Sequence, residues 1–507
     1  MVSQTAGLIP LEYLSAPLAA LPAPPSHFIP LLAALRSGGP ITIAAFGSSV
    51  LALAGGCTAP IPSLHTPWCL ARCPLCCALQ CGLWGDTGWA RSLLAVLNAS
   101  YPHPRHVLYN FGEPGGDVML PFAACPATHL SELPSPPHLV LLDTATASAY
   151  SLHRIATHLA ALSPPPAVLV LELTRFLPPR AEGGAPLLAA LAAAAPAVHP
   201  HINTSSPAAS IAAAFLGPTP TAHLFANFSR RPALVAFAAD ERRRLRAVRA
   251  VARRHALPLV STFGAYAAPM AEGRLAVAAY SPLDGLHPHW DAAHSPAAAA
   301  SQAFLTELLA FHLLRGLAAA AAAPPPPPPP PPSPAEPRRL LCFELDEAGY
   351  ASARAGGGAL ALLNHSRGWG FTPREALSRT VHKPGLAAAA AGASLWLRLE
   401  VPPRAALVLR VQFLRSWRGM GACDVRCARG CACEARRLEG AWARLASYVS
   451  TEALPLRTEG GGACVLEFRV APSGGGARGG SRFKLVRLIV ERQVAEDEWL
   501  TEEALAS

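Results

Sequence analysis

Apolar residues in the first 316 positions fall into short continuous runs, and these runs alternate with longer segments of helical spacing. The runs predict strands at 41–46, 106–110, 138–143, 167–172 and 258–262. The helical spacing predicts helices at 88–100, 240–255 and 297–315. Continuous apolar strands separated by helices are typical of a mostly parallel sheet covered on both faces. We therefore expect an α/β fold in this part of the chain.

The pattern changes after position 339, where apolar and polar residues alternate. Examples are "SLWLRLEV", "ALVLRVQFL", "CVLEFRV" and "FKLVRLIV". Strict alternation indicates antiparallel strands with one buried face. This part reads as a β-sandwich of about 150 residues, an ordinary size for a domain.

A proline run separates the two patterns, in "AAAPPPPPPPPPSPAEP" at 321–337. Such a run adopts extended polyproline II and acts as a semi-rigid spacer of roughly 30 Å. The chain of 507 residues is also too long for one ordinary domain. The expected division is an N-terminal segment at 1–39, an α/β domain at 40–316, an Ala/Pro-rich linker at 317–338, a β-sandwich at 339–495 and a tail at 496–507.

The first predicted strand ends at a glycine followed by two hydroxyl residues, Ser48 and Ser49. In parallel α/β sheets, sites form at the carboxyl ends of the strands. A plain turn explains the same residues. The alternative is a nucleophilic Ser49, which would need a base, a carboxylate that orients the base, and donors for an oxyanion.

The base and the carboxylate are predicted in "SPLDGLHPHWDAAH" at 281–294. Asp284 and His287 are three residues apart on a loop, so the carboxylate can reach the imidazole. A surface histidine in an ordinary turn is the alternative reading. Asp291 and His294 have the same spacing, but they lead into the next helix, and we therefore favour the first pair.

A glycine-rich stretch, "YNFGEPGGDV" at 109–118, follows the second predicted strand. Glycines let the backbone bend and expose its amides. We expect the N–H groups of Gly115 and Ser49 to hold the oxyanion.

Together these segments resemble the SGNH (GDSL-like) hydrolase family. "GSSV" at 47–50 resembles its first block, G-D-S-L, with Ser48 in the Asp place and Ser49 as nucleophile. The stretch 110–115 resembles the second block, and "DGLHP" at 284–288 resembles the fifth, D-x-x-H-P. The resemblance implies a flavodoxin-like three-layer α/β/α sandwich and a serine esterase that uses Ser49, His287 and Asp284 without metal or cofactor. It also suggests O-acyl groups on a polysaccharide as the substrate.

The third block of that family, G-x-N-D, is not matched. The corresponding stretch is "LLDTATASAY" at 141–150, which has no Asn. Losing one oxyanion donor costs about a hundred- to a thousandfold in rate. Thr144, Thr146 and Ser148 are candidate substitutes. Two further functions stay open: a non-catalytic glycan-binding protein on the same scaffold, and an O-acyltransferase with the same triad.

The C-terminal part resembles the β-rich module that follows SGNH-like domains in some algal and plant-type proteins. The resemblance rests on "KPGLAAAAAGASLWLRL", "LRSWRGMGACDVRCARGCACE" and "FKLVRLIVE". It implies a glycan-binding or a stabilising module.

The chain has 13 cysteines, concentrated in two places. For Cys423, Cys427, Cys431 and Cys433, with Cys464 and Cys342 further away, we favour two or three disulfides over a zinc site, because paired C-x-x-C knuckles are missing.

The second group lies at 69–81, and its first three cysteines have the C-x3-C-x2-C spacing of radical iron–sulfur enzymes. We interpret that segment as an insertion. Cys57 is expected to pair within this group or with Cys125.

The net charge of +10 comes nearly all from arginine and would suit an acidic partner such as a uronic-acid polymer. The densest arginine cluster, at 240–256, is predicted to be the solvent-exposed face of an amphipathic helix. No nucleic-acid-binding motif is present, and no uninterrupted apolar segment is long enough to span a bilayer. Nothing in the sequence indicates an oligomeric state.

The localisation signals disagree. The apolar start lacks a basic n-region. N-x-Ser/Thr sequons at Asn98, Asn203, Asn227 and Asn364, together with the cysteines, favour the secretory route.

Overall fold

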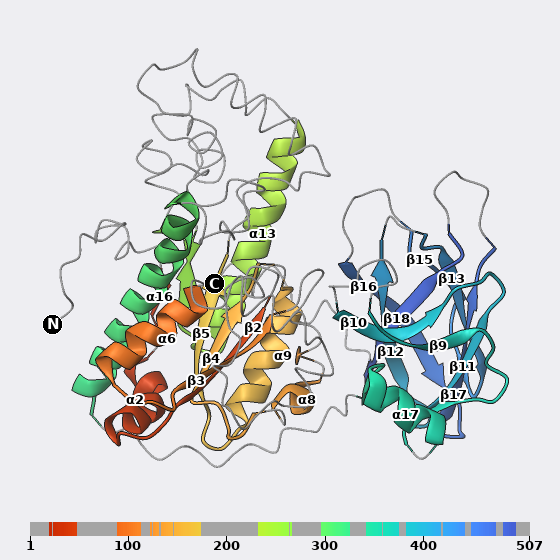
Figure 1. Cartoon of the computed structure of the whole chain (residues 1–507), viewed down its shortest axis with the longest axis horizontal. Helices are drawn as coiled ribbons and strands as arrows, with labels where there is room; N and C mark the ends of the chain where they lie inside the picture. The colour runs from red at the N-terminus through yellow and green to blue at the C-terminus, as the bar shows by residue number, and fades with distance from the viewer. Residues whose placement is uncertain are drawn as a thin grey trace.

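The protein has an α/β part up to residue 324 and a β-rich part from residue 341, as seen in a computed structural model (Figure 1). The structure describes residues 20–22, 24–47, 89–112, 122–123, 125–130, 133–145, 147–173, 232–262, 264–265, 296–324, 341–356, 358–374, 382–416, 419–441, 448–472 and 480–492.

Among these residues, the α/β part contains a six-stranded sheet in the order β1-β6-β5-β4-β2-β3. Its strands are β1 (Ala20–Leu21), β2 (Thr42–Gly47), β3 (Val107–Gly112), β4 (Leu139–Asp143), β5 (Ala167–Glu172) and β6 (Leu259–Ser261). All neighbours pair in parallel except the short β1, which pairs antiparallel with β6. Taken in chain order, the five parallel strands are arranged 2-1-3-4-5, a doubly wound order. The five strands predicted from the apolar runs are confirmed, with slightly different ends.

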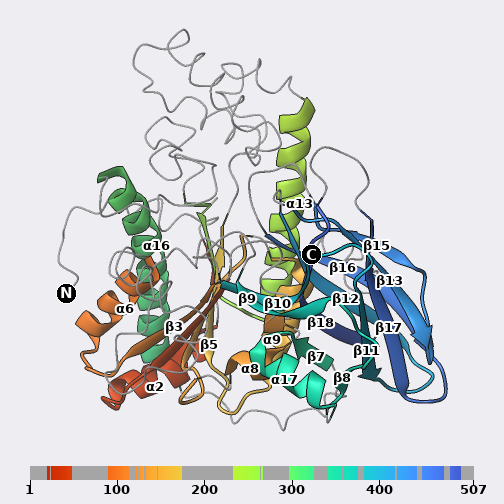
Figure 2. The same cartoon turned by 45° about the vertical axis from the view of Figure 1, so that its right-hand side comes forward.

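Helices cover both faces of this sheet, as Figures 1 and 2 show. Alternate strand residues contribute to separate cores: Ile43 and Leu141 pack on one side, and Phe46 and Leu142 on the other. One side is covered by η1 (Pro25–Phe28), α2 (Ile29–Arg36), α6 (Trp89–Ser100) and α16 (Pro296–Ala322). The other is covered by α8 (Pro126–Leu130), α9 (Ala149–Ala160) and α13 (Pro232–Arg254). The part is thus a three-layer α/β/α sandwich.

Helix α16 continues to Ala322 and so enters the residues assigned to the linker by sequence, because alanine is the strongest helix former. Its segment Leu305–Ala322 is, among the described helices, the one long and apolar enough to cross a membrane. Leu308 and Leu313 on this helix are completely buried in the first core, and Phe28 packs against its Gly316. These contacts are those of a core helix.

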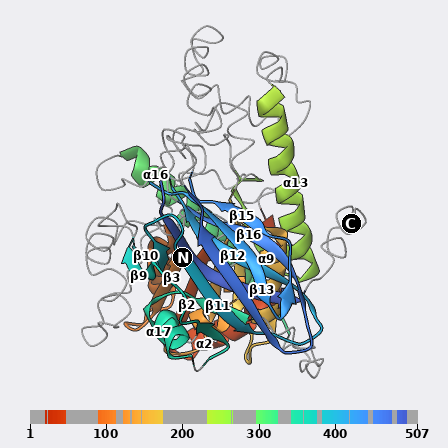
Figure 3. The same cartoon turned by 90° about the vertical axis from the view of Figure 1, so that its right-hand side faces the viewer.

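The β-rich part contains two antiparallel sheets over one apolar core (Figure 3). The first has the order β14-β16-β12-β18-β10-β9, with β7 also paired to β18, and the second has the order β15-β13-β17-β11-β8. Together with helix α17 (Glu347–Ala355), the strands are β7 (Leu341–Glu344), β8 (Leu360–Leu362), β9 (Trp369–Arg374), β10 (His382–Ala388), β11 (Ser394–Glu400), β12 (Ala406–Arg415), β13 (Ala422–Arg429), β14 (Cys431–Ala432), β15 (Arg436–Glu439), β16 (Tyr448–Thr458), β17 (Ala463–Val470) and β18 (Phe483–Arg492). The alternating pattern therefore predicted the β-sandwich correctly.

Candidate functional site

Most of the site residues predicted from the sequence lie outside the described residues. These are Ser49, Gly115, Thr146, Asp284 and His287, together with the alternative pair Asp291 and His294. The described residues nearest to them in the sequence are the ends of the parallel strands and the segments that follow β4 and β5.

All five parallel strands end at one edge of the sheet, the carboxyl edge, where α/β sheets hold their ligands. β2 ends at Gly47 and β3 ends at Gly112, directly opposite each other in the register. Ser49 follows Gly47 by two residues in the sequence, and Gly115 follows Gly112 by three. The two predicted contributors to acyl chemistry thus come from adjacent strands.

Gly47 packs directly against Asp143, the last residue of β4. A Cβ added to Gly47 would lie 2.3 Å from the Cβ of Asp143 and 2.8 Å from its Oδ2. The Asp143 side chain is completely buried, and its Oδ1 accepts a hydrogen bond from the Ala145 amide at 2.8 Å. A buried carboxylate thus lies beside Gly47, the last residue of β2, which precedes Ser49 by two positions in the sequence.

The loop between β4 and α9 is held by hydrogen bonds along its length. Thr144 is completely buried, and both its amide and its hydroxyl donate to the carbonyl of Leu171. The hydroxyl of Ser148 accepts from the Ser151 amide and caps the start of α9. The hydroxyls of Thr144 and Ser148 therefore have structural partners, and Thr146, between them, is outside the described residues.

Arg244 on α13 joins this loop to the end of β5. Its Nη1 donates to the carbonyl of Thr144 and its Nη2 to the carbonyl of Leu173, both at 2.6 Å. Two further hydrogen bonds, at 3.0 and 2.6 Å, bind Arg244 to the buried Glu241. One guanidinium therefore fixes the chain segments that leave two neighbouring strands.

Arg249, about one and a half turns further along α13, binds the carboxylate at the end of β5. Its Nε and Nη2 donate to the two carboxylate oxygens of Glu172 at 2.9 and 2.8 Å, and Nη2 also donates to Ser261. Burial acts to lower the pKa of Arg249 and the Glu172 contacts act to raise it, and the net result is a pKa above its ordinary value. Ser261 in turn donates to the same carboxylate.

These contacts correct one expectation. The arginines of 240–256 were predicted to be a solvent-exposed face, and for Arg244 and Arg249 that is wrong, because they are mostly buried and bind buried carboxylates. For Arg249, the sequence signal was the acidic residue Glu172 at the end of the apolar run "AVLVLE". A carboxylate that ends a buried strand needs a cation or donors nearby.

Asn110, predicted to close the second strand, lies on β3. Its side-chain oxygen accepts a hydrogen bond from the Gly112 amide at 2.9 Å. On the same face of the sheet as the α9 layer, Phe46 stacks on Phe122, with ring centroids 3.5 Å apart. Both ends of the glycine-rich loop are thus anchored in described structure.

The β-rich part contacts the α/β part beside the carboxyl edge. Cys125, at the start of α8, forms a disulfide with Cys342 of β7. Sequence reasoning gave Cys125 as one of the alternative partners of Cys57 and placed Cys342 with the C-terminal group, and the disulfide between Cys125 and Cys342 corrects both expectations. The Tyr150 hydroxyl on α9 donates to Glu491 of β18, and that carboxylate also binds Arg410 of β12.

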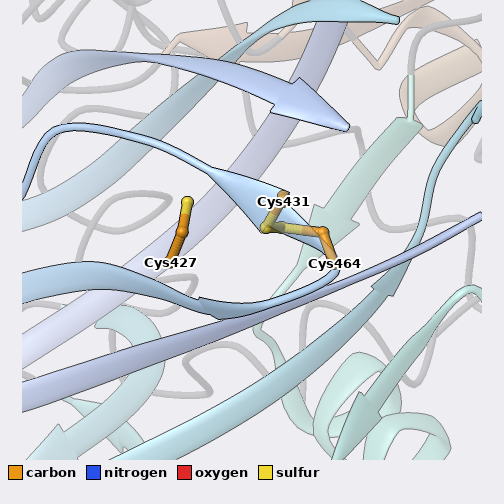
Figure 4. A group of neighbouring side chains, drawn as sticks. All are labelled: Cys427, Cys431 and Cys464. Carbon is orange, nitrogen blue, oxygen red and sulfur yellow. A yellow bond between two sulfur atoms is a disulfide. The ribbon is translucent and has the colours of Figure 1, made fainter. Parts of the chain in front are cut away.

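Two groups of side chains have the donor types and spacing of metal ligands: Cys427, Cys431 and Cys464, and Cys125, Cys342 and Glu344. Every cysteine of both groups is in a disulfide, since Cys125 pairs with Cys342, Cys427 with Cys433 and Cys431 with Cys464. Figure 4 shows the Cys431–Cys464 bond and the neighbouring Cys427. Disulfide sulfurs are not thiolates, and the thiolate is the form that binds metal. The preference for disulfides over zinc is therefore confirmed for Cys427, Cys431, Cys433 and Cys464, whereas Cys423 of the same cluster is a buried free thiol.

No protein-family model and no curated protein matches the sequence. The fold is similar to a crystal structure described as a two-domain esterase (CEX) active on acetylated mannans. The TM-score is 0.53, with 14% identity over 93% of this chain and 97% of that chain. A structure of the same description, co-crystallized with mannopentaose, gives a TM-score of 0.55 at 14% identity over 96% of this chain and 99% of that one. The α/β part and the β-rich part therefore share their fold with a two-domain esterase.

Proposed function

We propose that the protein is a serine esterase of the SGNH type that removes O-acyl groups from a carbohydrate. The observation that carries the proposal is the fold similarity, which extends over both parts of the chain to an esterase active on acetylated mannans. The strand order and the sequence Gly-Ser-Ser at the end of β2 support it independently of that similarity. Acetyl groups on a mannose-type or related polysaccharide are the substrate class that best fits the fold similarity.

In this proposal Ser49 attacks the acyl carbonyl carbon while His287 takes the proton from its hydroxyl. Asp284 orients the imidazole and stabilises its charged form. The oxyanion accepts hydrogen bonds from the N–H groups of Ser49 and Gly115. The sugar hydroxyl leaves with the proton from His287, and a water molecule then attacks the acyl-enzyme with His287 as base. The products are the free acid and the restored Ser49.

The described residues support this assignment by where they fix the chain. Asp143 lies against Gly47, and Arg244 fixes the segments after β4 and β5. A site that must hold an oxyanion needs its donors preorganised. A rigid carboxyl edge meets that need.

Three disulfides among the described residues fit an oxidising compartment. We therefore place the protein in the secretory pathway or outside the cell, where an acylated polysaccharide would be met.

The test is labelling with a fluorophosphonate probe together with acetate release from acetylated mannan. We expect the wild-type chain to label and release acetate, and Ser49→Ala to do neither. Ser48→Ala, the adjacent hydroxyl, is the matched control and should still label. A wild-type chain that is folded but neither labels nor releases acetate overturns the proposal.

One observation favours a second candidate, a non-catalytic glycan-binding protein on the same scaffold. The hydroxyls of Thr144 and Ser148 have structural partners, so neither obviously replaces the missing third-block Asn. In that case calorimetry would show binding of manno-oligosaccharide to a chain that does not label. An O-acyltransferase would instead label and, given an acceptor glycan, move acetyl to sugar rather than to water.

A further inference from the structure

We infer that the β-rich part positions the segments at Cys125 and Tyr150, which follow β3 and β4 beside the predicted site, through the Cys125–Cys342 disulfide and the Tyr150–Glu491 hydrogen bond. The inference rests on the proposed function and gives the β-rich part a role in the chemical step. That role is separate from any binding of polysaccharide by the same part.

The first step concerns the chain that follows Gly115. The described structure resumes at Phe122, whose ring stacks on Phe46 with centroids 3.5 Å apart and planes 11° from parallel. Phe46 directly precedes Gly47 at the end of β2. Phe122, which follows Gly115 by seven positions in the sequence, therefore packs against the strand that precedes Ser49.

Three residues later the chain is fixed covalently. Cys125 is buried and is joined to Cys342 across 217 positions of sequence, with the two Cα atoms 5.6 Å apart. Cys342 lies in β7 opposite Ile489 of β18. Cys125 and Ile489 form a small buried cluster with Tyr150 and Cys342 packed against it. The β-rich part thus holds the segment at Cys125, which follows the predicted oxyanion donor Gly115 in the sequence.

A second contact holds the neighbouring loop. Tyr150 is in the first turn of α9, two residues after the Ser148 cap that ends the β4–α9 loop. Its hydroxyl donates to Glu491, whose other oxygen binds Arg410, and the Arg410 guanidinium lies 5.3 Å from the Tyr150 ring centroid. The carboxylate is almost completely buried. Removing the Tyr150 hydroxyl therefore leaves a buried acceptor with one partner fewer.

The two contacts reach the α/β part at the loops after β3 and β4, which flank the end of β2 in the sheet order. Figure 3 shows the β-rich part packed in front of the α/β part. Because a shift of about 1 Å in a reacting group can cost a hundredfold in rate, anchoring these loops bears on the chemical step itself. The effect should therefore be visible with a small ester that makes no glycan contacts.

The experiment compares Cys125→Ser/Cys342→Ser with Cys427→Ser/Cys433→Ser. Each double variant removes one disulfide, but the second disulfide lies within the β-rich part alone. Hydrolysis of p-nitrophenyl acetate and the rate of fluorophosphonate labelling are measured, with the thermal midpoint as a check on folding. We expect kcat and the labelling rate of the first variant to fall about ten- to a hundredfold, with KM changed less than threefold. The control variant should keep the kcat of the wild type.

Tyr150→Phe provides a second route that leaves all disulfides intact, and its kcat should fall in the same direction with KM unchanged. If both variants fold and keep kcat within twofold of the wild type, the inference is overturned. A rise in KM for polysaccharide with kcat unchanged overturns it as well. A wild-type chain that does not label overturns the proposed function itself, and that outcome is distinct because it needs no variant. If the disulfide variant does not fold, Tyr150→Phe alone decides.

Discussion

Gly47 and Asp143 lie so close together that a Cβ at position 47 would be 2.3 Å from the Cβ of Asp143. The contact joins the ends of two paired strands, so neither the backbone of Gly47 nor the side chain of Asp143 can move away cheaply. We predict that Gly47→Ala lowers the free energy of unfolding by about 1–3 kcal/mol, the usual cost of overpacking a core. It should also lower esterase activity more than stability alone explains, because Gly47 is the last residue of β2 and the proposed nucleophile Ser49 follows it by two positions.

Urea denaturation and acetate release measure the two effects. Gly460→Ala is the matched control, since a Cβ there meets nothing within 4 Å. Equal stability of the Gly47→Ala variant and the wild type would contradict the close contact.

The ion pair between Glu172 and Arg249 leads to a prediction on stability. Glu172 is completely buried and Arg249 supplies two of its hydrogen bonds. Arg249→Leu leaves that carboxylate without its cation, and breaking a buried pair from one side costs about 3–5 kcal/mol. Arg246→Leu, an exposed arginine of the same helix, should change the unfolding free energy by less than about 0.5 kcal/mol.

Chemical denaturation measures the unfolding free energies of both variants. Similar small losses for the two would mean that the arginines of α13 are all solvent-exposed, as the sequence pattern suggested.

The contrast between these arginines shows what the sequence could and could not predict. Apolar runs located every parallel strand, because buried strands need apolar residues on both faces. Helical spacing located α13 as well. Spacing gives the polar face of a helix, but it does not say that a buried carboxylate on a distant strand lies beneath part of that face. Only the register of β5 against β6 brings Glu172 and Ser261 under Arg249.

The same limit applies to the interface of the two parts. Cys125 and Cys342 are 217 positions apart with other cysteines nearer to each of them, so local spacing did not indicate this pairing. Tyr150 and Glu491 have no sequence relation at all. For the site, the motifs name Ser49, Gly115, Asp284 and His287, and these assignments stay predictions because the four residues are outside the described structure.

Two histidines at the opposite edge of the sheet give a prediction on pH. The Nδ1 atoms of His106 and His138 accept hydrogen bonds from the amides of Ile41 and Thr42, at 3.1 Å each. An imidazole that accepts must be neutral at that nitrogen. Burial, with a smaller contribution from a neighbouring histidine, holds the pKa of each below the ordinary 6.5. The unfolded chain therefore binds protons more readily than the folded one.

The contribution of the two neutral histidines to the unfolding free energy is thus fully present above pH 6.5, and it is lost as the pH falls through their lowered pKa values. The unfolding free energy, measured by urea denaturation from pH 7.5 downward, should decrease over that range. His138→Asn keeps a side-chain acceptor without the titration, and its curve should be flatter than that of the wild type. An unfolding free energy that rises on acidification would show that the sign is wrong.

The hydroxyls after β4 give the last prediction, on how the oxyanion is held. Thr144 donates to Leu171, and Ser148 caps α9. Ser148→Ala should therefore lower the unfolding free energy by about 0.5–2 kcal/mol, the cost of losing a helix cap. Thr144→Val should be destabilising as well, because the Leu171 carbonyl loses a donor. Neither change should alter kcat on a small ester by more than about twofold, because neither hydroxyl is predicted to contact the substrate.

Thr146→Ala tests the remaining candidate: if its hydroxyl replaces the missing Asn, kcat should fall about a hundred- to a thousandfold with little change in stability. A large loss of kcat in Thr144→Val instead would mean that the hydroxyl leaves its partner during the reaction, and the oxyanion donors would then have to be reassigned.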